Sequence, residues 1–382
     1  MAAHQIPCWR NEFIMIFTCD KLLLSQAVVN ASRAVSAKSN LPALEGVYLR
    51  LEGNEISITG YDLEVGIITS ASVYGEEDGG VILNARLLGD ILRKLPNEEI
   101  SISVNEKLMT TICCGKIEYN IVGMPTDEYP SLPDINENTA FTMPQSMLKS
   151  MISQTIFAVA TDEIRAILTG VLFNKTTDVL TLTGLDGHRL AIREENIPSD
   201  ECFNFVVPSK SLGEVAKLLN DEDDKTVLIS VGRKHIIFDI SGTRVISRLL
   251  EGEFLDYTDS IVKGSSTEVI IKTREFIESL ERASLLINES NRSPVRCKFT
   301  DKNINLSCIT AIGKVHDEFE VLIKGDELEI GFNNKYLLDA LKATESDEVK
   351  LLLLGPLSPM KIVPLEGNDY LFLVLPMRLK AD

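Results

Sequence analysis

Residues 180–186 read LTLTGLD, and the same alternation of apolar and polar residues recurs as ISITGYD at 56–62 and INLSCIT at 304–310. The copies begin at positions 56, 180 and 304, so each lies 124 residues after the one before it. A period of two residues is typical of a strand that buries one face. Because this repeat is far longer than a solenoid unit, the pattern predicts three similar domains in one chain.

A helical pattern recurs at spacings of 124 and 125 residues. It reads LNARLLGDILRKLP from 83, VPSKSLGEVAKLLN from 207 and FNNKYLLDALKATE from 332, with an acid at one shared position: Asp90, Glu214 and Asp339. The apolar residues in each copy follow helical spacing. We expect Asn84 and Asn333 to cap their helices, and Pro208 to lie in the first turn of its helix.

A second helical pattern opens each repeat. It begins at Phe17, recurs at Phe141 and has a counterpart from Ile271. Each repeat therefore contains two helices among several short strands, and the fold class is predicted to be α+β.

The joints between the repeats are rich in residues that break regular structure, as in YPSLPDINENTA (129–140) and VKGSST (262–267). We therefore expect domains at 15–137, 138–263 and 264–382. Met15 is the expected beginning of the fold, and residues 1–14 are expected to be a disordered extension.

Composition points to a soluble, cytoplasmic chain. Of 382 residues, 45% are hydrophobic and 25% are charged, and no apolar run approaches the ~20 residues of a membrane span. The N-terminus lacks the apolar segment of a signal peptide. The formal net charge of −18 predicts long-range repulsion of nucleic acid, which any nucleic-acid hypothesis must overcome.

Seven cysteines without a C-x-x-C pair indicate reduced thiols. The vicinal pair Cys113 and Cys114 could serve redox or metal chemistry. The alternative is one buried and one exposed thiol, because adjacent residues of a strand point to opposite faces.

The most reactive combination of side chains follows the second copy of the repeated strand, at Asp186, His188 and Arg189. Asp186 matches Asp62 of the first repeat, whereas the third has Thr310 there, so this carboxylate is expected to bond nearby backbone in a turn. His188 and Arg189 have no basic counterpart in the other two repeats. The pair belongs to the middle repeat alone.

Three interpretations of this group stay open: a catalytic site, a structural turn with a hydrogen-bonded histidine, and a binding rim. Catalysis would need a nucleophile from elsewhere, since no G-x-S-x-G motif occurs. The histidines show no metal-ligand spacing, and no glycine-rich phosphate-binding motif occurs. We therefore expect no metal, no cofactor and no catalytic residue.

The triplicated layout, with NLPALEGVYLRL (40–51), TGLDGHRLA (183–191), IGFNNKYLLDAL (330–341) and the terminal LVLPMRL (373–379), resembles the bacterial sliding clamps, the beta subunits of DNA polymerase III. The resemblance implies three clamp domains with antiparallel sheets that form half of a closed homodimeric ring. It implies a non-catalytic processivity factor that encircles duplex DNA without sequence readout. The implied partners are the polymerase alpha subunit, the clamp loader and other replication or repair proteins that dock linear peptides; no membrane is involved.

The family's peptide pocket lies between the second and third domains. Carried over residue by residue, it comprises Leu168, Leu185, Gly187, His188, Arg189, Leu190 and Leu255 from the middle repeat and its linker, and Asn333, Tyr336, Leu357, Pro359, Val374, Leu375, Pro376, Met377, Arg378 and Leu379 from the third. Taken alone, the terminal run LFLVLPMRL (371–379) favours a buried C-terminal strand over a pocket wall. The linker FLDYTDSIV (254–262) has Leu255 and Val262 where the family often has proline, and Asp259 where some members have arginine.

The helices of the family line the hole of the ring, which would reconcile an acidic chain with DNA. Screening acts over ~8 Å at physiological salt, so a local basic lining can face phosphates while the shell stays negative. The candidates are Arg33, Lys38, Arg86, Arg93, Lys94, Lys149, Arg165, Lys210 and Lys217. Each could instead merely solvate its helix. Leu285 and Leu286 match family positions at the dimer interface.

Overall fold

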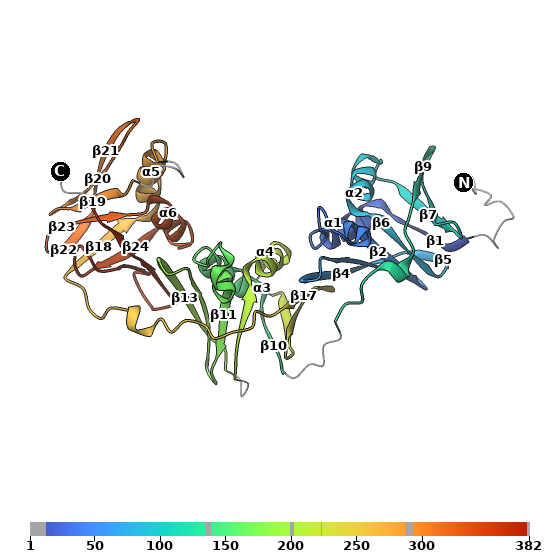
Figure 1. Ribbon diagram of the computed structural model, residues 1–382, viewed down its shortest axis with the longest axis horizontal. Helices are drawn as coiled ribbons and strands as arrows, with labels where there is room; N and C mark the ends of the chain where they lie inside the picture. Colours follow the sequence, from blue (N-terminus) through green and yellow to red (C-terminus); the bar gives the residue numbers. More distant parts are fainter. Residues whose placement is uncertain (1–12, 134–138, 199–201, 223, 288–292, 380–382) are drawn as a thin grey trace. The chain divides into compact units, whose positions relative to one another are not determined.

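The computed structural model describes residues 13–133, 139–198, 202–222, 224–287 and 293–379 (Figure 1). Residues 1–12 of the expected extension, residues 134–138 at the first joint and the tail at 380–382 lie outside the described residues. The first strand begins at Phe13, two residues before the expected start at Met15.

The elements follow the repeats. The first repeat contains β1 (Phe13–Asp20), α1 (Lys21–Ser32), η2 (Pro42–Glu45), β2 (Gly46–Glu52), β3 (Glu55–Tyr61), β4 (Val65–Ser72), β5 (Tyr74–Glu77), β6 (Gly79–Asn84), α2 (Ala85–Lys94), β7 (Glu99–Asn105), β8 (Met109–Cys114), β9 (Ile117–Val122) and η3 (Thr126–Glu128). The second contains β10 (Thr139–Pro144), α3 (Gln145–Ile156), η4 (Glu163–Thr169), β11 (Gly170–Lys175), β12 (Val179–Leu185), β13 (Arg189–Asn196), β14 (Phe203–Pro208), α4 (Ser209–Leu218), β15 (Thr226–Val231), β16 (His235–Ile240), β17 (Thr243–Arg248) and η5 (Thr258–Ser260).

The third repeat contains β18 (Thr267–Lys272), α5 (Thr273–Ser284), β19 (Val295–Phe299), β20 (Asn303–Thr310), β21 (Gly313–Glu320), β22 (Leu322–Gly325), β23 (Leu328–Phe332), α6 (Asn334–Lys342), β24 (Glu348–Leu353), β25 (Met360–Val363), β26 (Tyr370–Val374) and β27 (Pro376–Met377). The three sequence copies that predict the repeat are the strands β3, β12 and β20. The α+β prediction is confirmed, because each repeat combines α-helices with antiparallel strand pairs.

Both predicted helix caps form. Asn84 accepts a hydrogen bond from the Leu87 amide at 2.9 Å, and Asn333 accepts one from the Lys335 amide at 3.0 Å. Each satisfies an amide that the first helical turn leaves without a partner. Pro208 ends β14 and α4 starts one residue later, so Pro208 lies just before the first turn rather than in it.

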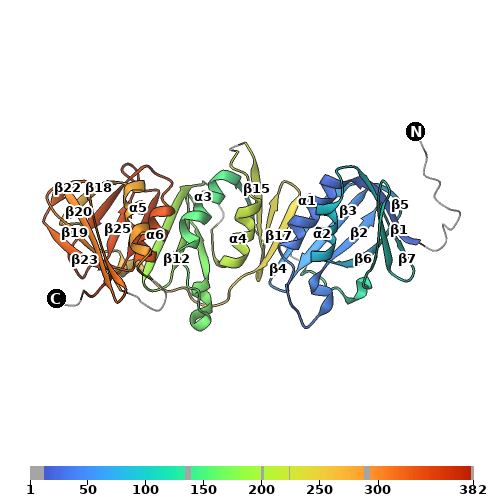
Figure 2. The same ribbon diagram turned by 90° about the horizontal axis from the view of Figure 1, so that it is seen from above.

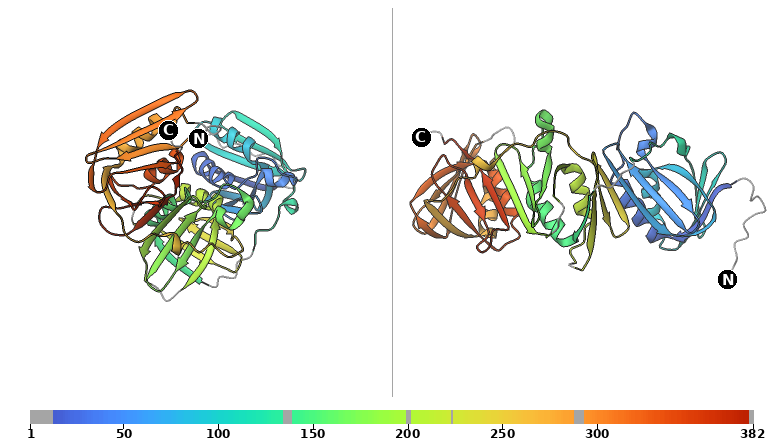
Figure 3. Two further views of the ribbon diagram at one scale, coloured as in Figure 1. Left: turned by 60° about the vertical axis from the view of Figure 1, so that its left-hand side comes forward. Right: turned by 90° about the horizontal axis from the view of Figure 1, so that it is seen from below.

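The chain divides into two compact units. Unit 1 contains Met1–Ser146 with Lys217–Arg248, and unit 2 contains Met147–Ala216 with Leu249–Asp382. In unit 1, α1 and α2 lie side by side against the strands, and α5 and α6 do so in unit 2 (Figures 1 and 2). Figure 3 presents both units from two further sides. The middle repeat contributes strands to both units.

One kind of strand contact joins consecutive repeats. In unit 1 the sheet β10-β15-β16-β17-β4-β3-β2-β6 passes from the second repeat to the first through the pair β17·β4. In unit 2 the sheet β14-β11-β12-β13-β26-β25-β24-β18-β22 passes from the second repeat to the third through β13·β26. The smaller sheets are β5-β1-β7-β8-β9 and β21-β20-β19-β23-β27.

A glycine in the repeated strand lets the first helix of its repeat approach closely. A Cβ at Gly60 would lie 1.9 Å from the Ala31 carbonyl oxygen, and one at Gly184 would lie 2.3 Å from that of Thr155. Backbone therefore meets backbone at the ends of α1 and α3, and any side chain would force the two elements apart. Within the described ranges, no helix is long and apolar enough to cross a membrane.

We predict that Gly184→Ala destabilises the protein by about 2 kcal/mol, because the added methyl group overlaps the Thr155 carbonyl and the core must shift. The matched variant Gly213→Ala lies within α4 and meets no heavy atom within 4 Å. It should be neutral or stabilising by up to about 1 kcal/mol, as expected for glycine in a helix interior. Urea unfolding followed by circular dichroism measures both. Equal stability of the two variants would contradict the close-approach account.

Candidate functional site

The turn after β12 is built by one carboxylate. Asp186 Oδ1 accepts hydrogen bonds from the backbone amides of His188 at 2.8 Å and Arg189 at 3.0 Å. Gly187 between them has a φ of +87°, a conformation that favours glycine. The turn presents the exposed His188 side chain and directs Arg189 into β13.

The sister turns repeat these bonds. Asp62 Oδ1 accepts from the amides of Glu64 at 3.0 Å and Val65 at 2.7 Å, and Thr310 Oγ1 accepts from the Ile312 amide at 3.3 Å. The prediction that the Gly-x-Asp corner is architectural is therefore confirmed. What distinguishes the middle repeat is the pair of side chains that follows the corner.

Arg189 is held by charged and aromatic groups from both the second and third repeats. Its Nε donates to Asp186 Oδ2 at 3.0 Å, and its Nη1 donates to Asp339 Oδ2 at 2.6 Å. The guanidinium carbon lies 4.5 Å from the centroid of the Tyr336 ring. The Arg189 side chain is 6% exposed, whereas Lys335, which donates to the same Asp339 oxygen at 2.6 Å, is 71% exposed. Arg189 is thus a buried residue that links the second and third repeats, whereas Lys335 lies at the surface.

His188 lies beside this junction. Its ring stacks on Tyr336 with centroids 6.0 Å apart and an interplanar angle of 20°. Its carbonyl oxygen accepts from the Leu375 amide at 2.9 Å, which continues the pairing of β13 with β26. The predicted His188, Arg189 and Tyr336 are therefore brought together by a sheet that spans two repeats.

A cavity of about 780 Å³ opens next to this group. Its lining comes from Thr161, Asp186, Arg189, Ser284, Ile287, Ser293, Asn333, Asn334, Lys335, Tyr336, Leu338 and Met377. Four predicted pocket residues are among them: Arg189, Asn333, Tyr336 and Met377. The mixture of apolar walls with a few fixed polar groups is typical of a binding site.

Three predicted leucines form a neighbouring apolar cluster. Leu168, Leu185 and Leu190 are 4%, 3% and 5% exposed and pack with Leu373. The linker residues Phe254, Tyr257 and Ile261 pack against the same cluster. These three leucines are therefore buried beneath the linker in this structure.

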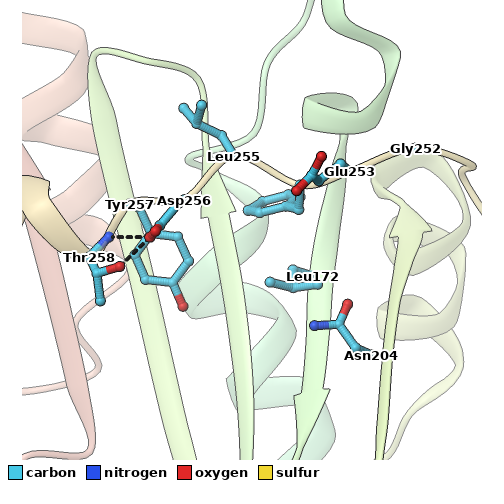
Figure 4. A pocket seen from close by; sticks show the side chains of 9 residues that line it. Leu172, Asn204, Gly252, Glu253, Leu255, Asp256, Tyr257 and Thr258 are labelled. Atoms are coloured by element: carbon cyan, nitrogen blue, oxygen red, sulfur yellow. Dashed lines mark hydrogen bonds between the residues drawn. The ribbon is translucent and has the colours of Figure 1, made fainter.

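The linker forms one wall of a second cavity, of about 660 Å³ (Figure 4). Leu255 lines it and is 45% exposed, opposite Leu172 of β11 and Asn204 of β14. The Thr258 amide donates to Asp256 Oδ1 at 3.0 Å and closes a turn in the linker. Leu255 thus lies at an open position, where its side chain makes an apolar surface.

The remaining predicted residues lie in different surroundings. Val374, one of the family's pocket positions, is 0% exposed and packs in the main core of unit 2. Leu357 is 78% exposed and Leu375 is 38% exposed. The other four, which are outside the lining of the first cavity, are at least partly accessible: Pro359, Pro376, Arg378 and Leu379.

The candidate DNA-facing residues gather on helices of the first two repeats. Arg33 caps the C-terminus of α1 and Lys38 follows it; Arg86, Arg93 and Lys94 lie on α2; Lys149 lies on α3; Arg165 lies in η4; Lys210 and Lys217 lie on α4. All are exposed except Lys149, which is half-buried.

The first helix of the third repeat, α5, begins with paired charges. Arg274 of α5 pairs with Glu278 at 2.8 Å, and Lys272, which precedes the helix, pairs with Glu275 at 3.0 Å.

The expected dimer residues lie at the end of α5. Leu285 caps the helix and is 82% exposed, and Leu286 lies beside Gly313, the first residue of β21. Within the part of the chain that the structure describes, β21 is an edge strand of its sheet. An exposed apolar residue beside an open strand edge is a typical protein interface.

Asp339 and Lys335 are site residues that sequence reasoning did not assign. Asp339 was visible only as a shared acid of the helical pattern, and its partner Arg189 lies 150 residues away along the chain. A basic residue found in one repeat beside an acid found in all three is the signal that could have identified the pair.

The described residues contain no cluster of three or more His, Cys, Asp and Glu side chains suited to a metal ion. Cys114 is buried and Cys113 is half-buried, and burial raises the pKa of both thiols. A raised pKa disfavours the thiolate that nucleophilic or metal chemistry requires.

Three family models match consecutive parts of the chain. They describe the DNA polymerase III beta subunit: its N-terminal domain at residues 15–133, its central domain at 142–256 and its C-terminal domain at 261–378.

Full-length relatives agree with these matches. The beta sliding clamp of Bacillus subtilis (strain 168) is 36% identical over 377 residues, which cover 95% of this chain and 100% of the relative. That of Staphylococcus aureus is 33% identical over 376 residues, with 96% and 100% coverage. Among solved structures, the Bacillus subtilis sliding clamp has a TM-score of 0.91 at 36% identity and covers 96% of this chain and 100% of that one. A Pseudomonas aeruginosa sliding clamp bound to griselimycin has a TM-score of 0.89 at 30% identity, with the same coverage.

We predict that Asp186→Ala destabilises the protein by about 3 kcal/mol, because it removes two turn bonds and leaves the buried Arg189 with one carboxylate fewer. The control is Asp186→Asn, whose amide oxygen can still accept both turn bonds while the charge that faces Arg189 is lost; it should cost about 1 to 2 kcal/mol. Urea unfolding compares the two variants. A loss for Asp186→Asn as large as that for Asp186→Ala would contradict the contribution of the turn bonds.

Proposed function

The chain belongs to the DNA polymerase III beta subunit family, the sliding clamps, and from this we propose that two copies close head to tail into a ring around duplex DNA. In this role it tethers the replicative polymerase and other partners to the template in the bacterial cytoplasm. The family consists of processivity factors without catalytic activity, so the chain is not an enzyme.

The observation that carries the proposal is the strand junction used twice within the chain. In the order of the repeats, β4, β13 and β21 occupy one position and β9, β17 and β26 another. β4 pairs with β17 of the following repeat, and β13 pairs with β26 of the following repeat. A third junction of this kind would join β21 to β9 of a second copy, since both are edge strands in the described residues. Such a contact uses different surfaces of the two copies and closes when the rotation permits.

The two existing junctions also give the register of the third. Tyr119 of β9, Val245 of β17 and Phe372 of β26 hold the same position in their repeats. In the adjoining strand, they pair with Ile112, Phe238 and Ile362 respectively. Val245 pairs with Ile67, and Phe372 pairs with Ala191. Ile67, Ala191 and Val315 follow one another at intervals of 124 residues, so they hold the same position in the three repeats.

Tyr119 of one copy should therefore oppose Val315 of the other. One position along, Glu118 would oppose His316, a pair of complementary charge when the histidine is protonated. Leu285, at the end of the helix α5 that packs against β21, would cover the apolar side of this contact, where Val122 of β9 is 72% exposed.

The basic helices support DNA passage. Exposed cations just after α1 and on α2 and α4 can approach phosphates, while the negative charge of the remaining surface is screened within about 8 Å at physiological salt. These contacts carry no base readout, so they would permit sliding. The topological link, and not tight binding, would retain the protein.

The cavity beside Arg189 supports the docking of partner peptides. Tyr336 and Met377 offer apolar contacts, and Asn333 offers a polar one. An extended segment that carries an apolar anchor suits such a lining. Peptides of the polymerase alpha subunit and of the clamp loader are the proposed ligands.

We predict that the protein stays on circular DNA and is lost from linear DNA, because encirclement is topological. The labelled protein is loaded on a nicked plasmid by its cognate clamp loader and separated by gel filtration, before and after one restriction cut. Light scattering of the free protein should give twice the 42.3 kDa chain mass. Equal loss from circular and linear DNA would rule out encirclement.

A disulfide tests the register. A chain that carries Tyr119→Cys and Val315→Cys should form a covalent dimer under mild oxidation, since directly opposed strand residues lie within disulfide reach. The control chain carries Tyr119→Cys and Asp317→Cys, two residues out of register on the same face, and should cross-link at least about tenfold less, as the distance limit requires. Non-reducing electrophoresis measures both. Equal yields from the two chains would exclude this pairing.

A further inference from the structure

The second helix of each repeat carries an acid at the same position, which is occupied by Asp90, Glu214 and Asp339. The first residue of the strand after the repeated turn is Val65, Arg189 or Gly313. Only the second repeat offers a cation there. The shared acid of the third repeat therefore meets a guanidinium at the junction β13·β26, next to the proposed docking cavity.

The geometry fixes the plane of this guanidinium. Two carboxylates, Asp186 and Asp339, hold different nitrogens of Arg189 at 3.0 and 2.6 Å, and Tyr336 covers the guanidinium at 4.5 Å. A planar cation bonded along two edges and stacked on a ring has little freedom left. Because Asp186 comes from the second repeat and Asp339 from the third, the pair of carboxylates also sets how β13 and α6 meet.

Asp339 is not itself part of the cavity lining, whereas Arg189 and Tyr336 are. Its carboxylate is 26% exposed, and it reaches the lining through Arg189. Tyr336 in turn stacks on His188 at 6.0 Å. One carboxylate outside the cavity thus orients three side chains at its border.

We propose that Asp339 is a positioning residue for peptide docking: it fixes the Arg189 guanidinium, and through it the rings of Tyr336 and His188, without touching the peptide. This inference rests on the proposed function of the cavity. It explains why an acid found in all three repeats has a docking role at one of them, since only there does a guanidinium pass its orientation to aromatic side chains.

The test measures binding of a fluorescein-labelled peptide, which carries the clamp-binding motif of the polymerase alpha subunit, by anisotropy on the full-length dimer. Asp339→Asn keeps the shape and removes the charge. Asp339→Asn should weaken the affinity for the peptide about tenfold, which equals about 1.4 kcal/mol of binding free energy. Asp339→Glu restores the charge and should return the affinity to within about threefold of the unmodified protein, since the conservative carboxylate can again bond Arg189.

Asp90→Asn is the matched control, because Asp90 holds the same position in α2 and pairs with Arg93 instead. It should leave peptide affinity within about twofold, as a distant surface change does. If the unmodified protein binds no peptide, the proposed function of the cavity fails. If the unmodified protein binds the peptide, and His188→Ala weakens this binding while Asp339→Asn does not, the cavity is a docking site but the positioning role of Asp339 is wrong. Failure of Asp339→Glu to recover, or loss of the dimer in Asp339→Asn by light scattering, also overturns it.

Discussion

Open strand edges are the constraint on which this architecture depends. A sheet edge exposes backbone groups that need hydrogen-bond partners, and an uncovered edge invites pairing with another chain. The repeats satisfy one another's edges: β17 covers β4, and β26 covers β13. Among the described strands, β9 and β21 keep the same two kinds of edge uncovered at the first and third repeats. One interaction thus accounts for the joining of the repeats within a chain and, in our proposal, between chains.

Much of the frame could be predicted from the sequence because it is encoded three times. LTLTGLD and its sisters identify β3, β12 and β20, and Asn84 and Asn333 cap their helices as expected. Comparison of the copies also separated Asp186, which belongs to the frame, from His188 and Arg189, which do not. A pattern seen once would not have permitted that distinction.

The details of the site were less accessible from the sequence. An alternating strand tells which residues share a face but not which face a neighbouring repeat will cover, so the sequence could not distinguish the full burial of Val374 from a place in a pocket wall. Asp339 could not be paired with Arg189 because 150 residues separate them. Such contacts depend on how sheets continue between repeats, which local propensity does not encode.

The repeated corner has a consequence for how such a protein can diversify. Its geometry depends on one short polar side chain and on the main-chain amides after it, as at Asp62, Asp186 and Thr310. Nearly every residue type has a backbone amide, so the fold does not require any particular side chain at the positions that supply these amides. Each copy therefore has positions whose side chains can vary while the backbone of the corner stays the same. A new recognition surface can arise in one copy by substitution alone, while the other two continue to specify the same backbone.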